Sequence, residues 1–188
     1  MNKKLTAPLE NWMESIIDYR GKTPKKKTSG IPLITAKVIK GGRISTPNEY
    51  IALEDYEEWM SRGIPKAGDV VITTEGPLGE IAQLPNEKVA LAQRVITMRG
   101  KKNLVDNTYL KYLLLSKDFQ HKLYSRSTGT TVLGIKQSDL RKIDLTFPEI
   151  GSQRAIANIL GSLDEKIEIN KKSNETLEGI AKAIFKSW

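Results

Sequence analysis

Apolar side chains recur at alternating steps of four and three residues along the last part of the chain, residues 152–188. The positions of this stripe are Ile156, Leu160, Leu163, Ile167, Asn170, Asn174, Leu177, Ala181, Ile184 and Trp188. A repeat of 3.5 residues keeps one narrow stripe of a helix facing a second helix, which is typical of a left-handed coiled coil. Because no proline interrupts the stretch, we expect one C-terminal helix about 50 Å long. The stripe, named here the heptad seam, is its expected dimer interface.

Two asparagines, Asn170 and Asn174, occupy adjacent positions near the middle of the heptad seam. Polar residues in a coiled-coil seam cost stability and fix the register of the helices. In a parallel dimer each asparagine meets its own copy, whereas in an antiparallel dimer Asn170 of one chain meets Asn174 of the other. The pattern fits both registers equally well. A third interpretation is that the helix packs on its own domain and that the asparagines are solvated.

Shorter apolar segments precede this helix, and they predict both strands and short helices. Strands are expected at residues 31–38, 69–74, 80–84, 89–98 and 142–147, and helices at residues 54–62 and 106–124. The second of these helices is expected to break near Ser116, and Gly41–Gly42 to form a tight turn. Since strands and helices do not alternate regularly, we expect an α+β fold. Residues 1–149 then form a domain with a twisted, mixed β-sheet and short helices, and residues 150–188 form the long coiled-coil helix.

The formal net charge of +8 is concentrated before the C-terminal helix. Residues 1–150 hold 24 Lys and Arg against 17 Asp and Glu, whereas residues 151–188 hold 6 against 5. The segment from Arg20 to Arg43 carries eight of these cations and no acid. Such a segment favours a polyanion as the partner; the competing interpretation is a solvated basic loop.

The sequence offers few groups for catalysis or metal binding, because it has no cysteine and one histidine, His121. The Gly-Lys-Thr of residues 21–23 lacks the preceding glycine of a phosphate-binding loop, since Ile16 stands there. The Asp-Glu-Lys triplet at residues 164–166 resembles a nuclease motif, but no further acids accompany it, so we interpret it as a solvated helix face. No segment approaches the roughly 18 apolar residues of a membrane span. We therefore expect a cytoplasmic, non-catalytic binding protein without a metal or cofactor of its own.

Several stretches resemble the specificity subunits of type I restriction-modification systems. In the first part of the chain these stretches are Asp18–Pro24, Gly30–Lys37, Gly68–Gly79, Ala92–Arg94 and Thr128–Thr131. In the predicted helix they are Gln153–Ala157, Leu163–Asn170 and Asn174–Leu177. Their order and their spacing from the terminal helix carry the resemblance over nearly the whole chain.

The resemblance implies a function and a set of partners. Members of this family carry target recognition domains that each read one half of a split DNA sequence, and their long helices dock modification subunits. They have no catalytic activity; their partner subunits methylate adenine with S-adenosylmethionine, or cut DNA with ATP and magnesium. Because the two helices of a family member run antiparallel, the resemblance favours an antiparallel homodimer through the heptad seam and a palindromic, interrupted target. With one domain and one helix, the chain looks like a half subunit or a truncated product.

On this interpretation residues 1–149 bind double-stranded DNA, and the helix docks methyltransferase subunits, with the restriction subunit as a further candidate partner. Candidate DNA contacts are Arg20, Lys22, Lys25, Lys26, Lys27, Lys37, Lys40, Arg43, Lys66, Arg94, Arg126, Thr128, Thr130, Thr131 and Lys136. The three threonines either bond to DNA or only shape a turn. The candidate docking face of the helix holds Glu165, Lys166, Glu168, Lys172 and Glu178. The competing class is a basic interaction module on a dimerising stalk that binds RNA or an acidic protein.

Overall fold

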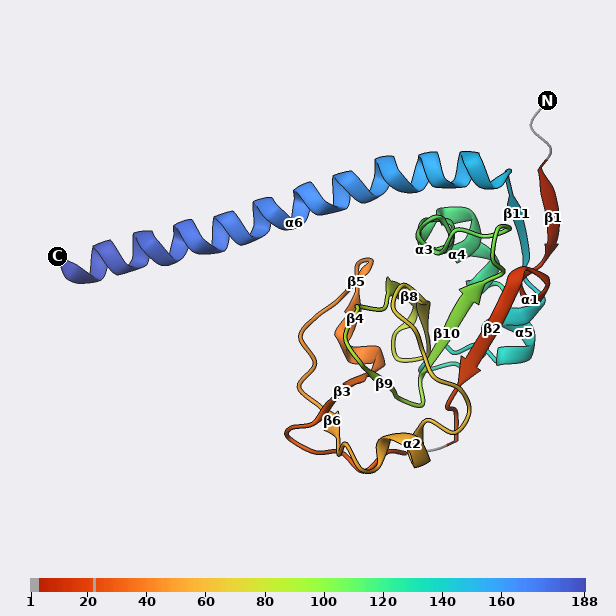
Figure 1. The fold of residues 1–188 in the computed structure, drawn as a ribbon, viewed down its shortest axis with the longest axis horizontal. Helices are drawn as coiled ribbons and strands as arrows, with labels where there is room; N and C mark the ends of the chain where they lie inside the picture. The colour runs from red at the N-terminus through yellow and green to blue at the C-terminus, as the bar shows by residue number, and fades with distance from the viewer. Residues whose placement is uncertain (1–3, 22) are drawn as a thin grey trace.

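The computed structural model describes residues 4–21 and 23–188, and it places one long helix over a body of small sheets and short helices (Figure 1). This helix, α6, spans Ile150–Ser187. Its first half lies over the body beside α3 (Asn107–Leu115). Its second half extends away from the body, and every residue from 169 onward is exposed. The long C-terminal helix predicted from the sequence is therefore confirmed.

A four-stranded antiparallel sheet runs through the centre of the body. Its order is β2–β10–β7–β8, formed by Met13–Asp18, Val95–Gly100, Val70–Thr74 and Leu78–Gln83. Successive side chains of a strand point to opposite faces of the sheet, and both faces are covered here. Val70 and Ile72 belong to one hydrophobic core, whereas Val71 belongs to a second. The β-branched run of β7 thus suits a strand that is buried on both faces.

The first core lies between the central sheet and a group of helices. The helices are α1 (Leu9–Trp12), α3, α4 (Lys117–Tyr124) and α5 (Gln137–Arg141). An antiparallel pair of strands, β1 (Leu5–Pro8) and β11 (Asp144–Phe147), closes one side of this core. Ser116 separates α3 from α4 and caps α4, since its hydroxyl accepts a hydrogen bond from the Phe119 amide at 3.3 Å. The predicted break at Ser116 is confirmed.

The second core lies on the other face of the central sheet. Its three-stranded sheet has the order β6–β3–β9, formed by Tyr50–Ile51, Ile31–Ile34 and Ala90–Leu91. The remaining elements on this side are the 3₁₀ turn η1 (Ala36–Val38), β4 (Ile39–Lys40), β5 (Arg43–Ile44) and α2 (Tyr56–Trp59). The α+β class is confirmed, but the described residues divide their strands among several small sheets instead of one mixed sheet.

The β4–β5 hairpin contains the predicted turn at Gly41–Gly42. Both glycines have positive φ angles, 57° and 83°. A two-residue hairpin turn of type I′ requires positive φ at both central positions, and glycine adopts such angles without strain. The turn therefore fixes the register of the hairpin that carries Lys40 and Arg43.

Helix α6 contacts the body through one of its faces, and the heptad seam lies on a different face. Gln153 and Ala157 are buried against the body. The Gln153 side chain accepts a hydrogen bond from the Asp106 amide at 3.0 Å and donates to the Pro148 carbonyl at 2.8 Å. Seam residues Leu163 and Ile167 are about half exposed. Since one residue turns a helix by about 100°, most of the seam is rotated away from the docked face and remains open, while Leu160 is partly buried.

Five side chains, named here the helix clamp, hold the middle of α6 on the body: Arg43, Lys111, Tyr112, Asp164 and Glu168. The Asp164 carboxylate accepts hydrogen bonds from Lys111 Nζ at 2.8 Å and from Tyr112 Oη at 2.7 Å. Arg43 forms an ion pair with Glu168 at 3.0 Å and donates to the Asp164 carbonyl at 3.3 Å. The interpretation of residues 164–166 as a solvated face is therefore wrong for Asp164.

One alternative from the sequence was that the long helix packs on its own domain. The structure shows such packing only for the first half of α6. The helix clamp is the last point at which α6 meets the body, because every residue beyond Glu168 is exposed. Asn170 and Asn174 lie in this exposed half. The two asparagines are thus available to a second helix.

Candidate nucleic-acid interface

The parallel pairing of β3 with β9 creates a hollow at one edge of the second core. Leu33 pairs with Ala90 and Ile34 with Leu91, so the carboxyl ends of both strands meet at this edge. The chain continues into residues 35–37 after β3 and into residues 92–94 after β9. Together they line a hollow of about 250 Å³, named here the strand-end hollow. Its lining is completed by Thr23, Pro24, Lys26, Glu49 and Gly76.

A second hollow of about 330 Å³ adjoins the strand-end hollow and shares Gln93 and Arg94 with it. Its other lining residues are Arg20, Gly21 and Glu75. Gln93 is also tied to the preceding loop, since its side-chain oxygen accepts a hydrogen bond from the Thr23 hydroxyl at 3.4 Å. The two hollows are therefore adjacent and meet at Gln93 and Arg94.

Four of the predicted DNA contacts, Arg20, Lys26, Lys37 and Arg94, meet on this surface. Lys26 is paired with Glu49 at 2.9 Å, and Arg94 with Glu75 at 3.0 Å. Both cations are about half exposed. Ion pairs between exposed side chains contribute little free energy, so Arg94 can exchange the exposed Glu75 for a phosphate at low cost, whereas Glu49 is only 24% exposed and depends more on Lys26.

The loop that holds the three predicted threonines lies beside the second hollow. Thr128 and Gly134 exchange backbone hydrogen bonds of 2.8 and 2.9 Å, and the Ile135 amide donates to the Thr74 carbonyl at 3.0 Å. Gly129 has a φ of +113°, and a Cβ atom there would collide with the Val132 carbonyl oxygen. The loop is thus fixed by its backbone. The side chains of Thr128, Thr130 and Thr131 stay exposed, so a contact with DNA by these hydroxyls remains a prediction.

Arg20 links this loop to the basic segment. Its guanidinium donates a hydrogen bond to the Ile135 carbonyl at 2.7 Å, next to the exposed Lys136. Arg126 is also exposed, just before the loop. Lys136 therefore lies near the second hollow, which Arg20 lines, although it is more than 100 residues from Arg20 in sequence.

Other predicted cations lie elsewhere. Arg43 belongs to the helix clamp, and Lys40 stands on the same hairpin beside it. Lys66 lies in the turn before β7, at the opposite end of that strand from Thr74. Lys27 is exposed, and its backbone pairs with Tyr50. Arg43 has a partner on α6, and its contact with DNA stays a prediction; Lys22 lies outside the described residues.

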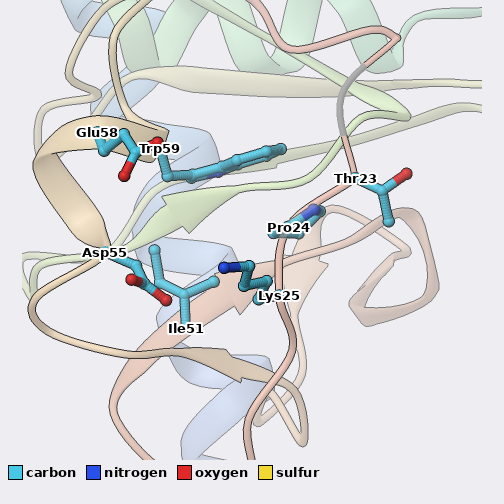
Figure 2. Close-up of a pocket in the computed structure, with 7 residues that line it drawn as sticks. All are labelled: Thr23, Pro24, Lys25, Ile51, Asp55, Glu58 and Trp59. Carbon is cyan, nitrogen blue, oxygen red and sulfur yellow. The ribbon is translucent and has the colours of Figure 1, made fainter.

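Lys25 lines a separate hollow of about 300 Å³, shown in Figure 2. Asp55 and Glu58 also line it, and Figure 2 shows the Lys25 amine extending toward Asp55. Ile51 and Trp59 provide its apolar wall. Because two carboxylates accompany one cation, this hollow repels phosphate, and Lys25 is a weaker candidate for DNA contact than Lys37.

Sequence reasoning missed the polar groups that stand among the cations, Glu49, Glu75 and Gln93. Gln93 had a signal, since it belongs to the family-like stretch Ala92–Arg94. Glu75 had the same kind of signal, since it belongs to the stretch Gly68–Gly79, but Glu49 had none, because it joins the surface only through the pairing of β6 with β3. Among residues 4–21 and 23–188, no group of three or more His, Asp or Glu side chains is placed to hold a metal ion. No helix in the same residues is long and apolar enough to cross a membrane.

Comparison with known proteins identifies the family. Residues 14–179 match the model of the type I restriction modification DNA specificity domain, and the chain belongs to this family. The MjaIX specificity subunit of Methanocaldococcus jannaschii is 31% identical over 181 residues, which cover 89% of this chain and 40% of that protein. The HindI specificity subunit of Haemophilus influenzae is 30% identical over 128 residues, or 65% of this chain and 28% of that protein.

Solved structures show the same fold. The HsdS subunit from Thermoanaerobacter tengcongensis superposes with a TM-score of 0.63 at 18% identity, over 90% of this chain and 39% of that one. The specificity subunit from M. genitalium gives 0.58 at 17% identity, over 89% and 40%. This chain thus spans about 40% of the length of these relatives.

Proposed function

We propose that this chain is a non-catalytic DNA specificity subunit of a type I restriction-modification complex and that it reads one half of a split target. The observation that carries the proposal is the meeting of Arg20, Lys26, Lys37 and Arg94 around the two hollows, in a chain of this family. These cations come from three separate segments. A basic surface assembled in this way suits a phosphate backbone that passes over the carboxyl ends of β3 and β9.

On the proposed recognition surface, the charged groups and the hydrogen-bonding groups have different roles. The four cations bind phosphates and set the position of the domain on the duplex, while polar groups inside the hollows contact base edges. Lys26 and Arg94 are held in place by Glu49 and Glu75 before DNA arrives. A phosphate replaces the carboxylate contact of Arg94, and neutralisation of phosphates releases counterions from the duplex, so binding is salt-dependent.

The dimer is supported by the open heptad seam. In the single chain Leu163, Ile167, Leu177 and Ile184 are each about half exposed or more. An unpaired stripe of this length costs free energy in water, and a second copy of α6 covers it. Antiparallel pairing centred between Asn170 and Asn174 places seam residues opposite seam residues and relates the two recognition domains by a two-fold axis.

Modification subunits are proposed to dock on the exposed outer face of the paired helices, around Lys172 and Glu178. The methyl donor S-adenosylmethionine, and ATP with magnesium where a restriction subunit joins, belong to those subunits in this account. The residues of this chain supply sequence recognition and assembly.

Fluorescence anisotropy with labelled duplex DNA and with RNA of the same sequence tests the proposal. Four phosphate contacts predict that log affinity for DNA falls with log salt at a slope of about −3 to −4. Lys37→Gln should weaken binding to all sequences and make the slope shallower by about 1. The matched control is Lys117→Gln, an exposed cation at the start of α4 that lines neither hollow. A slope near zero, tighter binding of RNA, or equal effects of both variants would contradict the proposal.

A further inference from the structure

The hollow shown in Figure 2 brings two carboxylates together beside an aromatic ring. Asp55 is the N-cap residue of α2 and Glu58 follows three residues later, so their side chains are neighbours on the same side of this turn. Both acids line the hollow, which has a volume of about 300 Å³. Like charges on neighbouring helix positions repel each other. A cation between the two carboxylates would offset this repulsion.

Neither carboxylate has a hydrogen bond or an ion pair with a group among residues 4–21 and 23–188. Asp55 stands at the start of α2, but its side chain accepts no hydrogen bond from the helix. Lys25 lines the same hollow and extends toward Asp55 in Figure 2, yet the two side chains form no ion pair. The acceptor oxygens of both acids are therefore open to a ligand that carries several donors.

The aromatic wall of the hollow is held in place by the second core. The indole Nε1 of Trp59 donates a hydrogen bond to the Leu91 carbonyl at 3.0 Å. Its ring stacks on Tyr19 with the ring centroids 5.5 Å apart, and the Tyr19 hydroxyl donates to the Gly63 carbonyl at 2.8 Å. Figure 2 shows the Trp59 ring edge-on, across the hollow from Pro24. Because the face of a tryptophan ring attracts cations, this fixed ring also favours a positively charged ligand.

The chemistry of the lining favours a guanidinium group over other charged groups. A guanidinium is planar, stacks on aromatic rings and has five donors to share between two carboxylates. An ammonium group is a compact, strongly hydrated charge and occupies aromatic faces less often. Phosphates are repelled, because residues 54–58 hold four acids and no cation. The hollow is thus suited to arginine and unsuited to the DNA backbone.

The exposed rim of the hollow indicates that the guanidinium comes from a protein surface. Thr23, Lys25 and Glu58 are exposed, whereas sites for free small molecules enclose most of the ligand. A side chain that its own protein holds in place needs less enclosure, because part of its freedom is already lost. Residues 54–58 form a local acidic segment in a chain of net charge +8, so a basic partner surface is complementary to them.

We propose that this hollow receives an arginine side chain of a partner protein. The carboxylates of Asp55 and Glu58 accept hydrogen bonds from the guanidinium, which stacks on the Trp59 ring and displaces the Lys25 amine. The hollow shares Thr23 and Pro24 with the strand-end hollow, so a partner docked here lies beside the proposed DNA surface. The arginine site needs no DNA, and its test is therefore independent of the proposed function.

NMR titration of the full chain with ¹⁵N-labelled tryptophan tests the arginine site. The chain has three tryptophans, and Trp59→Phe identifies the indole signal of Trp59. The probes are three tripeptides with blocked ends, which carry arginine, lysine or citrulline between two glycines. The arginine peptide should shift the Trp59 signal saturably, with a dissociation constant of about 1–10 mM. The lysine peptide should bind about 3-fold or more weakly, and the neutral citrulline peptide should give no saturable shift.

Asp55→Asn and Glu58→Gln should each weaken binding of the arginine peptide by about 3-fold or more. Glu57→Gln is the matched control, because Glu57 is an exposed acid on α2 that does not line the hollow. This variant has the same change in charge and should keep the wild-type affinity. Unfolding curves establish that the three variants are folded, and the peptide series on the wild-type chain does not depend on them.

Four results would overturn the inference. They are no saturable shift with the arginine peptide, a lysine peptide that binds as tightly, a citrulline peptide that binds as tightly, and equal losses in all three variants. None of these results bears on the DNA affinity that tests the proposed function, so the arginine site and the DNA surface stand or fail separately.

Discussion

At the scale of single residues, the pair Asp69–Arg99 shows a charge used for structure and not for binding. Asp69 is 1% exposed and accepts hydrogen bonds from Arg99 Nε at 2.8 Å and Nη2 at 2.7 Å. The same carboxylate accepts from the Lys66 amide at 2.8 Å. The hydrogen bond with Asp69 is the largest cause that raises the pKa of Arg99, so the guanidinium stays charged. The pair joins the start of β7 to β10.

Asp69→Asn should lower the free energy of unfolding by about 3 kcal/mol, because it removes the buried charge opposite Arg99 and leaves only Glu14, at 3.9 Å, as an acidic partner of the guanidinium. The matched control is Asp118→Asn, which removes the exposed ion pair with Lys122 on α4 and should cost less than about 0.5 kcal/mol. Urea denaturation of both variants gives the comparison. Equal losses would show that the buried pair has no special role.

The sequence located the basic segment but not the partners of its members. Lys26, Lys37 and Arg20 reach the hollows, whereas Arg43 pairs with Glu168, which lies 125 residues later. The positions of cations in a sequence indicate where positive charge is concentrated. They do not indicate which acidic side chain the fold places beside each cation. Asp164 was misread for the same reason, since its partners on α3 are more than 50 residues away.

At the scale of elements, long periodic segments were predictable and short ones were not. Helix α6 and strand β7 were evident from their apolar spacing and β-branched residues. Strand β6 has two residues, which is too short for any period to appear, whereas β9 lies inside the strand segment expected at residues 89–98. Strand β1 was missed because it contains Pro8 and forms by pairing with β11, which is far from it in sequence. The strand-end hollow depends on the parallel pairing of β3 with β9, which the separate segments do not indicate.

The helix clamp should make the attachment of α6 sensitive to acid. Burial acts to raise the pKa of Asp164, but hydrogen bonds from Lys111 and Tyr112 outweigh it, and the pKa is lowered. A lowered pKa in the folded state gives stabilisation that is complete above the unfolded pKa of about 4 and is lost as the pH falls through the folded value. The difference in unfolding free energy between the wild type and Asp164→Asn should therefore be large near pH 7 and shrink below about pH 4.

Glu175→Gln is the control for the clamp, because Glu175 lies on the exposed half of α6. Urea denaturation across the pH range should show no comparable difference for this variant. A constant difference for Asp164→Asn from neutral to acid pH would indicate that the carboxylate charge does not hold the helix.

A charge introduced into the heptad seam should prevent α6 from forming the proposed dimer. Leu163→Asp should give a folded monomer, since Leu163 is half exposed in the single chain but enclosed in the proposed dimer. The loss of the second domain should weaken binding to a full target by about 100-fold or more. Ile169→Asp is the matched control, because Ile169 is 63% exposed and lies outside the seam. Sedimentation velocity should show a monomer for the first variant and a dimer for the second; a dimer for both would contradict the seam assignment.

At the scale of the whole molecule, the proposed DNA-binding surface and the proposed dimer interface lie on separate parts of the structure. The two hollows lie at the carboxyl ends of β3 and β9, while the heptad seam continues along α6 beyond the body (Figure 1). The helix clamp joins the two parts and sets the direction in which α6 leaves the domain. In the proposed dimer, two copies paired through antiparallel helices would hold their hollows at a fixed separation and in opposite orientation.

The central claim, that paired chains read two halves of one duplex, is tested most directly by sequencing the DNA that the wild-type chain enriches from a random duplex library. The account predicts one short half-site that occurs twice, in inverted orientation, with a gap of constant length. A single unrepeated site, two half-sites in the same direction, or no enrichment over the starting library would contradict it.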